Sequence, residues 1–85
     1  MGLINRVVPD DRLEMTAQEL ASRLASGPAI ALRQIRRAAW SALDSNWEQA
    51  LKTEREGQRI AGLTSDFQEG IAAFREKRPP RFQGR

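Results

Sequence analysis

The chain has 85 residues and a net charge of +3, and it contains no cysteine, no histidine and no tyrosine. A chain of this length allows one small domain with a thin hydrophobic core. The absence of cysteine and histidine excludes disulfide bonds, thiolate metal sites, a cysteine nucleophile and the usual protein ligands of zinc. The 14 basic and 11 acidic side chains are interspersed, which is typical of a solvated surface rather than of an arm that binds nucleic acid.

The first ten residues are β-like and end in a turn. Leu3, Ile4, Val7 and Val8 surround a polar pair, and Pro9 closes the run. One strand cannot form a sheet, and no second strand is indicated further along the chain. We therefore expect this segment to be the end of a larger unit, or an edge that pairs with another chain. No targeting signal or membrane-spanning run is visible, which predicts a soluble, cytoplasmic protein.

Helical periodicity begins at Asp11 and continues to residue 78 in four segments. In the first, we expect Asp10 or Asp11 to cap the N-terminus and Gly27 to follow the C-terminus. Pro28 is expected as the first residue of the second helix. Apolar stripes run along the first segment at Leu13, Ala17, Leu20, Ala21 and Leu24, and along the second at Leu32, Ile35, Ala39, Ala42 and Leu43.

The third segment has the clearest start signal. Ser45 is expected as the N-cap and Glu48 as its partner in a capping box. Gly57, inside the helix, costs about 1 kcal/mol relative to alanine unless a neighbouring backbone needs the space. Gly62 is expected to end this helix.

The fourth helix is expected to start with Thr64 or Ser65 as N-cap and to stop before Pro79 and Pro80. Four short amphipathic helices follow the extended N-terminal segment, with connections of only a few residues. This organisation predicts an all-α fold.

Two groups of charged residues are candidate sites, the glutamates Glu48, Glu54 and Glu56 and the arginines Arg33, Arg36 and Arg37. The glutamates could form an acid–base cluster, but helical surfaces routinely carry solvated glutamates and no pocket is indicated around these. The arginines lie at neighbouring positions of one helix and could bind phosphate. A solvated face is the favoured interpretation, because no aromatic residue or glycine-rich loop accompanies them.

The large aromatic residues at helical spacing are Trp40, Trp47, Phe67 and Phe74. Most such side chains belong to a core. Four amphipathic helices nevertheless have more apolar face than one small core closes, so an exposed patch for self-association or docking is equally expected. The stretch from Phe74 to Arg85 combines an aromatic residue with several cations, which can stack on a base and bind phosphate. A frayed basic terminus explains the same residues.

Four stretches together resemble the C-terminal portion of the enoyl-CoA hydratase/isomerase (crotonase) family. They are GLINRVVPDD, ELASRLASGPAIAL, WEQAL-x-x-E with Gln58, and TSDFQEGIAAFREKRPPRFQGR, and they cover nearly all of the chain. The last stretch carries the most specific pattern, EG-x-x-AF-x-EKR-x-P-x-F-x-G. The GPAIAL and TSDFQEG stretches are similar to isomerase-type members that act on phenylacetyl-derived CoA esters.

The resemblance implies that the catalytic core of such an enzyme is absent from this chain. Residues 1–10 would be an extended remnant of that core, residues 11–78 a helical oligomerisation and CoA-covering domain, and residues 79–85 a C-terminal tail. The family's oxyanion-hole N–H groups and proton-moving acidic residues belong to the preceding part, so this chain alone is expected to be inactive. Met1 directly before Gly2 looks like an added start, which implies a truncation.

By similarity, the AF-x-EK pattern places a binding site at Phe74 and Lys77. Phe74 would line a CoA or acyl pocket, and Lys77 would approach a CoA phosphate, often on a neighbouring subunit. The resemblance also implies assembly into trimers or pairs of trimers, and only weak acyl-CoA binding by the isolated chain. It implies no catalytic residue, metal or cofactor here apart from the acyl-CoA substrate of the parent enzyme, and no nucleic-acid or membrane partner.

The sequence therefore predicts the C-terminal helical assembly and acyl-CoA-covering domain of an enzyme of acyl-CoA metabolism. A free-standing helical module for protein–protein interaction is the alternative. A helical domain that binds nucleic acid is a third hypothesis, and its binding would weaken steeply with salt. Hydration and isomerisation cannot be told apart, because they differ mainly in acidic residues that this chain lacks.

Overall fold

The computed structural model describes residues 2–85, and over these residues it contains helices and no strand. A 3-10 turn, η1 (Asp10–Arg12), is followed by α1 (Leu13–Ala25), α2 (Ala29–Ala42), α3 (Trp47–Gly62) and α4 (Ser65–Glu76). The predicted all-α fold with four helices is confirmed. The inference of an added start concerns Met1, which lies outside the described residues.

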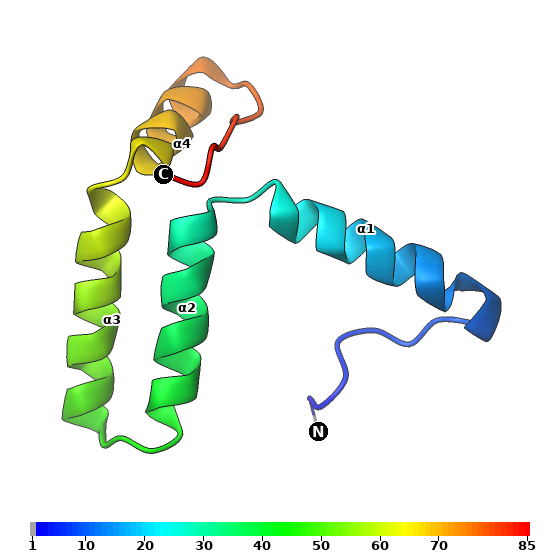
Figure 1. The fold of residues 1–85 in the computed structure, drawn as a ribbon, viewed down its shortest axis with the longest axis horizontal. Helices are drawn as coiled ribbons and strands as arrows, with labels where there is room; N and C mark the ends of the chain where they lie inside the picture. The colour runs from blue at the N-terminus through cyan, green and yellow to red at the C-terminus, as the bar shows by residue number, and fades with distance from the viewer. Residues whose placement is uncertain (1) are drawn as a thin grey trace.

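Helices α2 and α3 pair as an antiparallel hairpin, which is the most extensive contact between helices in the structure (Figure 1). Gly57 of α3 is buried in this hairpin. A β-carbon built on Gly57 would lie only 3.3 Å from Cβ of Gln34 on α2. A glycine at this position therefore lets a side chain of α2, rather than a neighbouring backbone, approach α3 closely.

Helix α4 lies at the end of the hairpin opposite its turn, and the last residues of the chain fold back along α4 (Figure 1). Two residues of α4 are almost completely buried, Ala73 with 2% and Asp66 with 3% of its surface exposed. Backbone N–H groups of the tail donate hydrogen bonds to carboxylates of α4. The alternative of a frayed basic terminus is therefore wrong, because the tail is held against the helix.

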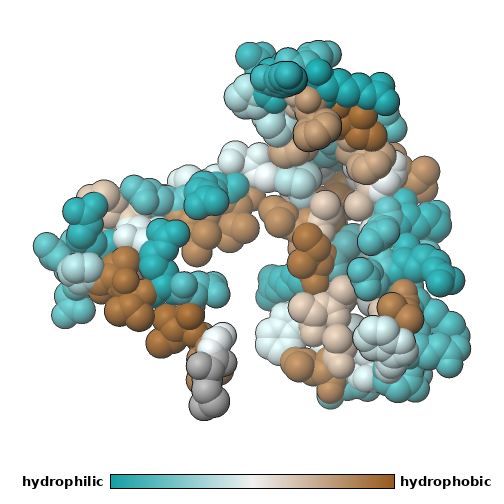
Figure 2. Space-filling view, turned by 180° about the vertical axis from the view of Figure 1, so that it is seen from behind, coloured by the Kyte–Doolittle hydropathy of each residue, from teal (hydrophilic) through white to brown (hydrophobic). Residues whose placement is uncertain are grey.

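Helix α1 projects away from the other helices and makes no extensive contact with them (Figure 1). The radius of gyration is 15.9 Å, whereas about 12 Å is expected for a compact domain of this length. The leucines of the α1 stripe, Leu13, Leu20 and Leu24, are between 48% and 61% exposed. Apolar side chains gather on the side of α1 that faces the hairpin and on the facing edge of the hairpin (Figure 2). Nothing within residues 2–85 covers this surface.

The start of α1 differs from the sequence prediction. Neither Asp10 nor Asp11 caps the helix through its side chain, because both lie in η1, and α1 begins only at Leu13. Pro28 is the N-cap of α2 rather than its first residue. Gly27 follows the C-cap of α1 as predicted.

The N-cap of α3 differs from the prediction by one residue, whereas the N-cap of α4 agrees with it. Asn46, not Ser45, is the N-cap of α3, and its Oδ1 accepts a hydrogen bond from the backbone N–H of Gln49 at 2.9 Å. Ser45 instead donates its hydroxyl to a carbonyl of α2. Thr64 caps α4 as predicted, and its Oγ1 accepts from the backbone N–H of Phe67 at 3.1 Å.

The prediction that most large aromatic residues belong to a core is wrong for the described chain. Trp40, Trp47, Phe67 and Phe74 are all exposed, because the helices form open arms rather than surrounding a common centre. The alternative of an exposed apolar surface holds.

Residues 2–9 form no strand, since no second strand is present in the described chain to pair with them. No described helix combines the length and apolar character needed to cross a membrane.

Candidate functional site

The two residues singled out by the family resemblance lie at the C-terminal end of α4. Phe74 belongs to the last turns of the helix and is 85% exposed. Lys77 is the C-cap of the helix and is also exposed. Both side chains are therefore exposed at the same end of α4, Phe74 within the helix and Lys77 at its C-cap.

Lys77 has a left-handed backbone conformation, with φ 54° and ψ 42°. It is the one described residue other than glycine with a positive φ. Its N–H donates to the carbonyl of Phe74, and the N–H of Arg78 donates to the carbonyl of Ala73 at 3.0 Å. This pattern closes a helix C-terminus, and glycine usually provides it because a β-carbon costs about 1 kcal/mol or more there. Lysine thus occupies a strained position of the kind that clusters at binding sites.

Phe74 lines an apolar groove of about 480 Å³. One wall is the exposed face of α4, which includes Phe67 and Phe74, and the starting residues of α2 form another. The ring of Phe82 comes from the folded-back tail, and Arg75 provides a cation at the groove. Lys77 is not among the lining residues. An apolar groove with a cation at its edge suits a ligand with an apolar body and an anionic group.

A charged cluster joins the tail to the middle of α4. Arg78 contacts the carboxylate of Glu69 through two nitrogens, at 2.6 Å and 3.1 Å, and its Nε donates to Glu76 at 2.6 Å. The hydrogen bond from Arg78, followed by one from the backbone N–H of Arg81, lowers the pKa of Glu69 from 4.5 to about 2. Glu69 and then Glu76 raise the pKa of Arg78. Arg78 is thus neutralised locally, whereas Lys77 forms no ion pair with any residue described.

The two other charged groups named from the sequence lie on exposed faces of α2 and α3. Glu48 pairs with Lys52 at 3.3 Å on an exposed face of α3. Glu56 pairs with Arg59, whose hydrogen bond lowers the pKa of this carboxylate. Arg33, Arg36 and Arg37 are exposed on α2. No three acidic residues within residues 2–85 come together in a way that could hold a metal ion. The solvated-face interpretation of both groups therefore agrees with the structure.

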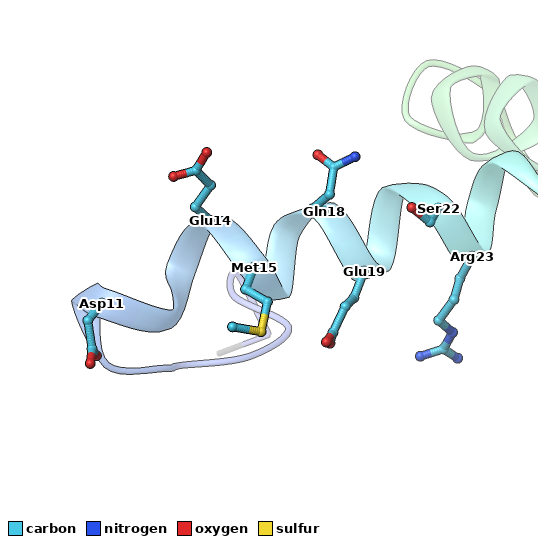
Figure 3. Close-up of a pocket in the computed structure, with 7 residues that line it drawn as sticks. All are labelled: Asp11, Glu14, Met15, Gln18, Glu19, Ser22 and Arg23. Atoms are coloured by element: carbon cyan, nitrogen blue, oxygen red, sulfur yellow. The ribbon is translucent and has the colours of Figure 1, made fainter.

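A hollow of about 880 Å³ lies alongside η1 and α1, away from Phe74 and Lys77. All of its lining residues come from Asp11 to Arg23, and their side chains point in different directions from one isolated helix (Figure 3). The polar groups do not converge on a common point. This hollow is open space beside an unpacked helix, and its polar side chains are not arranged to bind a common ligand.

The residues that hold the tail were missed at the level of sequence. The tail is held by two carboxylates of α4, Asp66 and Glu69, and by its own ring of Phe82. All three residues lie within the stretch TSDFQEGIAAFREKRPPRFQGR. A usable signal was present, because two carboxylates three residues apart precede a Pro-Pro break and a short polar segment. That pattern is compatible with a chain that turns back onto its helix.

The enoyl-CoA hydratase/isomerase family model matches residues 1–85. The chain is 43% identical over 84 residues to a 1,2-epoxyphenylacetyl-CoA isomerase of Escherichia coli (strain K12), spanning 99% of this chain and 32% of that protein. It is 40% identical over 85 residues to a probable enoyl-CoA hydratase of Rhodobacter capsulatus, spanning all of this chain and 33% of that protein. The chain thus spans about a third of the length of these relatives.

Solved structures agree with this result. The fold matches an enoyl-CoA hydratase subunit of Geobacillus kaustophilus with a TM-score of 0.91 and 42% identity, over 99% of this chain and 33% of that one. A hydratase of Bacillus anthracis gives a TM-score of 0.91 at 34% identity, again over 33% of its length. The arrangement of the four helices is therefore the one that these larger proteins also contain.

Proposed function

The chain belongs to the enoyl-CoA hydratase/isomerase family, and from that premise we propose that it is the C-terminal helical part of an enzyme of acyl-CoA metabolism. Its tasks in this proposal are subunit assembly and covering of the acyl-CoA site. Relatives named as a hydratase and as an isomerase of 1,2-epoxyphenylacetyl-CoA support fatty-acid or phenylacetate-type substrates for the whole protein. The cytoplasmic location stays a prediction.

The observation that carries the proposal is the amount of uncovered surface. The chain exposes 7733 Å², whereas a compact protein of 9.6 kDa is expected to expose about 5,100 Å². The excess of roughly 2,600 Å² is comparable with the area buried in permanent interfaces. Because much of it is apolar, covering it by other protein surface is strongly favourable.

The proposed binding role of the helix end rests on Phe74 and Lys77. Phe74 lines the groove, and its ring can pack on an apolar or aromatic part of acyl-CoA. Lys77 presents a compact positive charge on a flexible stem, which suits a CoA phosphate. Since this chain holds only one side of any such site, we expect weak affinity for acyl-CoA on its own.

Sedimentation equilibrium over a range of concentrations tests the assembly role. A closed oligomer, with a trimer or a pair of trimers as the expected state, supports assembly through these helices. A monomer at all concentrations contradicts it and places the assembly contacts elsewhere in the family's larger proteins.

Two activity measurements test the remaining parts. We expect no hydration of crotonyl-CoA by this chain. Appreciable turnover would mean that catalytic groups lie within these 85 residues. In a longer enzyme that carries this segment, Lys77→Ala should raise KM for acyl-CoA more than it lowers kcat, because the lysine touches only the nucleotide end. Equal losses in both constants would contradict the phosphate role.

A free-standing module for protein–protein interaction is the second candidate. The same open apolar faces favour it, since such surfaces mark docking sites. It differs in predicting a monomer that gains helical order and stability only with a partner of different sequence. A concentration-dependent homo-oligomer that binds acyl-CoA would argue against this candidate.

A further inference from the structure

The last residues of the chain, 79–85, form a strap that runs back along α4. Asp66 is the centre of its attachment: one carboxylate oxygen accepts the N–H of Gln83 at 2.7 Å, and the other accepts the N–H of Gly84 at 2.8 Å. The backbone N–H of Asp66 donates in turn to the main-chain oxygen of Arg85 at 2.8 Å. The hydroxyl of Ser65 donates to the same oxygen at 2.9 Å. The strap therefore also satisfies an N–H at the start of α4 that no helical carbonyl can accept.

The strap makes two further contacts beyond Asp66. The N–H of Arg81 donates to Glu69 at 2.8 Å. The ring of Phe82 lies 3.7 Å from the position that a β-carbon on Gly70 would take. Gly84, with φ +80°, approaches the start of α2, where its β-carbon position would be 3.8 Å from Cβ of Ala29. The strap thus links α4 to the hairpin and places Phe82 as one wall of the groove.

We propose that Asp66 is the latch of this strap, and that the strap opens and closes as a unit over the groove, carrying Phe82 in and out of its wall. Asp66 is suited to this role because both of its oxygens are used by the strap. A buried carboxylate that lost these two donors would be left unpaired, which opposes opening. The groove that Phe74 lines therefore has one wall that moves and others that are fixed by the hairpin and α4.

Amide hydrogen exchange on the 85-residue chain tests the latch without any ligand. Asp66→Asn keeps the shape of the side chain but turns one acceptor into a donor, so one strap N–H loses its partner. We expect the amides of Arg81, Gln83 and Gly84 to exchange roughly tenfold to a hundredfold faster, since a hydrogen bond to a charged group is lost. Amides in the middle of α4 should change by less than about twofold if the strap opens separately.

The matched control is Asp44→Asn, the same chemical change at an exposed residue in the hairpin turn, and it should leave strap exchange unaltered. Unchanged exchange in Asp66→Asn would overturn the latch. Equal acceleration of the strap and of α4 would also overturn the proposal, because the strap would then open only when the helix unfolds. A chain shortened to end at Pro80 serves as the fully open reference, and it leaves α4 unaltered in sequence.

The movement of Phe82 has its own measurement. A soluble nitroxide should enhance relaxation at the Gly70 amide in Asp66→Asn, toward the value in the shortened chain, and not in Asp44→Asn. Relaxation at Gly70 that stays at the wild-type value while the strap amides exchange faster would show that Phe82 does not follow the strap. That result would overturn its assignment as a moving wall.

The consequence for ligand binding rests on the proposed function. We expect Asp66→Asn and Phe82→Ala each to weaken binding of octanoyl-CoA about fivefold to tenfold through lost apolar contact, and the double variant to be no weaker than either. Additive losses would contradict action of Asp66 through Phe82. Failure of the wild-type chain to bind octanoyl-CoA would count against the proposed function, whereas the exchange and relaxation measurements judge the strap independently.

Discussion

The two ends of the molecule are stabilised in opposite ways. At the C-terminal end, α4 and the strap pair their polar groups closely: the carboxylate of Asp66 is buried with both oxygens bonded, and Glu69 and Arg78 neutralise each other. At the other end, α1 has an open apolar stripe and no extensive contact with another helix. The polar groups of α4 and the strap are therefore paired with each other, whereas the apolar side chains of α1 stay exposed within residues 2–85.

This difference reflects the range of the two kinds of interaction. Hydrogen bonds and ion pairs are satisfied by a few neighbouring groups, so a short segment such as the strap can complete them locally. Burial of an apolar stripe requires a second surface of matching size, which residues 2–85 do not place next to α1. The polar groups of the strap and α4 are thus paired with each other, whereas the apolar stripe of α1 is left uncovered by residues 2–85.

The largest effect is expected on the open stripe of α1. Replacing both Leu20 and Leu24 by glutamate should weaken self-association at least about a hundredfold, because each buried leucine contributes about 1.5–3 kcal/mol and a charge opposes burial. Sedimentation equilibrium measures the change. Gln18→Glu, on another face of α1, should leave the association constant nearly unaltered. Equal behaviour of the two variants would show that the stripe remains uncovered in the assembly.

A smaller effect is expected within the hairpin. Gly57→Leu should lower the free energy of unfolding by roughly 1–3 kcal/mol, because its β-carbon alone would lie 3.3 Å from Cβ of Gln34 and the larger side chain would force α2 and α3 apart. Gly62→Ala, at the end of the same helix, meets no atom within 4 Å and should be neutral or stabilising. Urea unfolding followed by helical circular dichroism compares them. If Gly57→Leu were tolerated like Gly62→Ala, the hairpin contact would not contribute to stability.

Lys77 is expected to lower the stability of the chain and to strengthen acyl-CoA binding. Lys77→Gly should raise stability by about 1 kcal/mol, because glycine adopts the left-handed conformation without the strain of a β-carbon. The same change should weaken acyl-CoA binding by removing the charge. Lys77→Ala separates the two effects, since it removes the charge but keeps the strain. A glycine variant with unchanged affinity would exclude a role for this cation.

The pH dependence of the strap should be the smallest effect. The pKa of Glu69 is lowered to about 2 in the folded chain from 4.5, so its stabilising effect is complete above pH 4.5 and is lost as the pH falls toward 2. Exchange of the Arg81 amide, which bonds to Glu69, should accelerate in this acidic range and stay constant between pH 5 and 8 after correction for intrinsic exchange. Glu69→Gln should remove the acidic transition, and a transition that persisted in it would assign the effect to another carboxylate.

Helix content and most helix ends followed from local rules. Gly62 ends α3 and Thr64 caps α4 because these signals depend on residues within one turn. The start of α3 shifted by one residue, from Ser45 to Asn46, because serine and asparagine are nearly equal as N-caps and stand side by side. Ser45 donates its hydroxyl to the carbonyl of Ser41, four residues earlier, which leaves Asn46 to cap the helix, and N-cap propensity alone does not rank the two residues.

The candidate site was predicted only in part. Phe74 and Lys77 came from a sequence pattern, and the structure places both at the C-terminal end of α4. Asp66 was not predicted, because its partners are seventeen and eighteen residues away. The exposure of Trp47 was missed for a related reason: helical spacing identifies an apolar residue but does not say which surface will cover it.

The sequence by itself determined that this protein is helical, where its helices lie within one or two residues, and to which family it belongs. Those properties depend on periodicity, capping and short motifs, which act between residues close along the chain. The tertiary structure decided that α2 and α3 pair at Gly57, that the strap returns to Asp66, and that the α1 stripe stays open. These outcomes depend on which distant surfaces meet, and no local pattern specifies that.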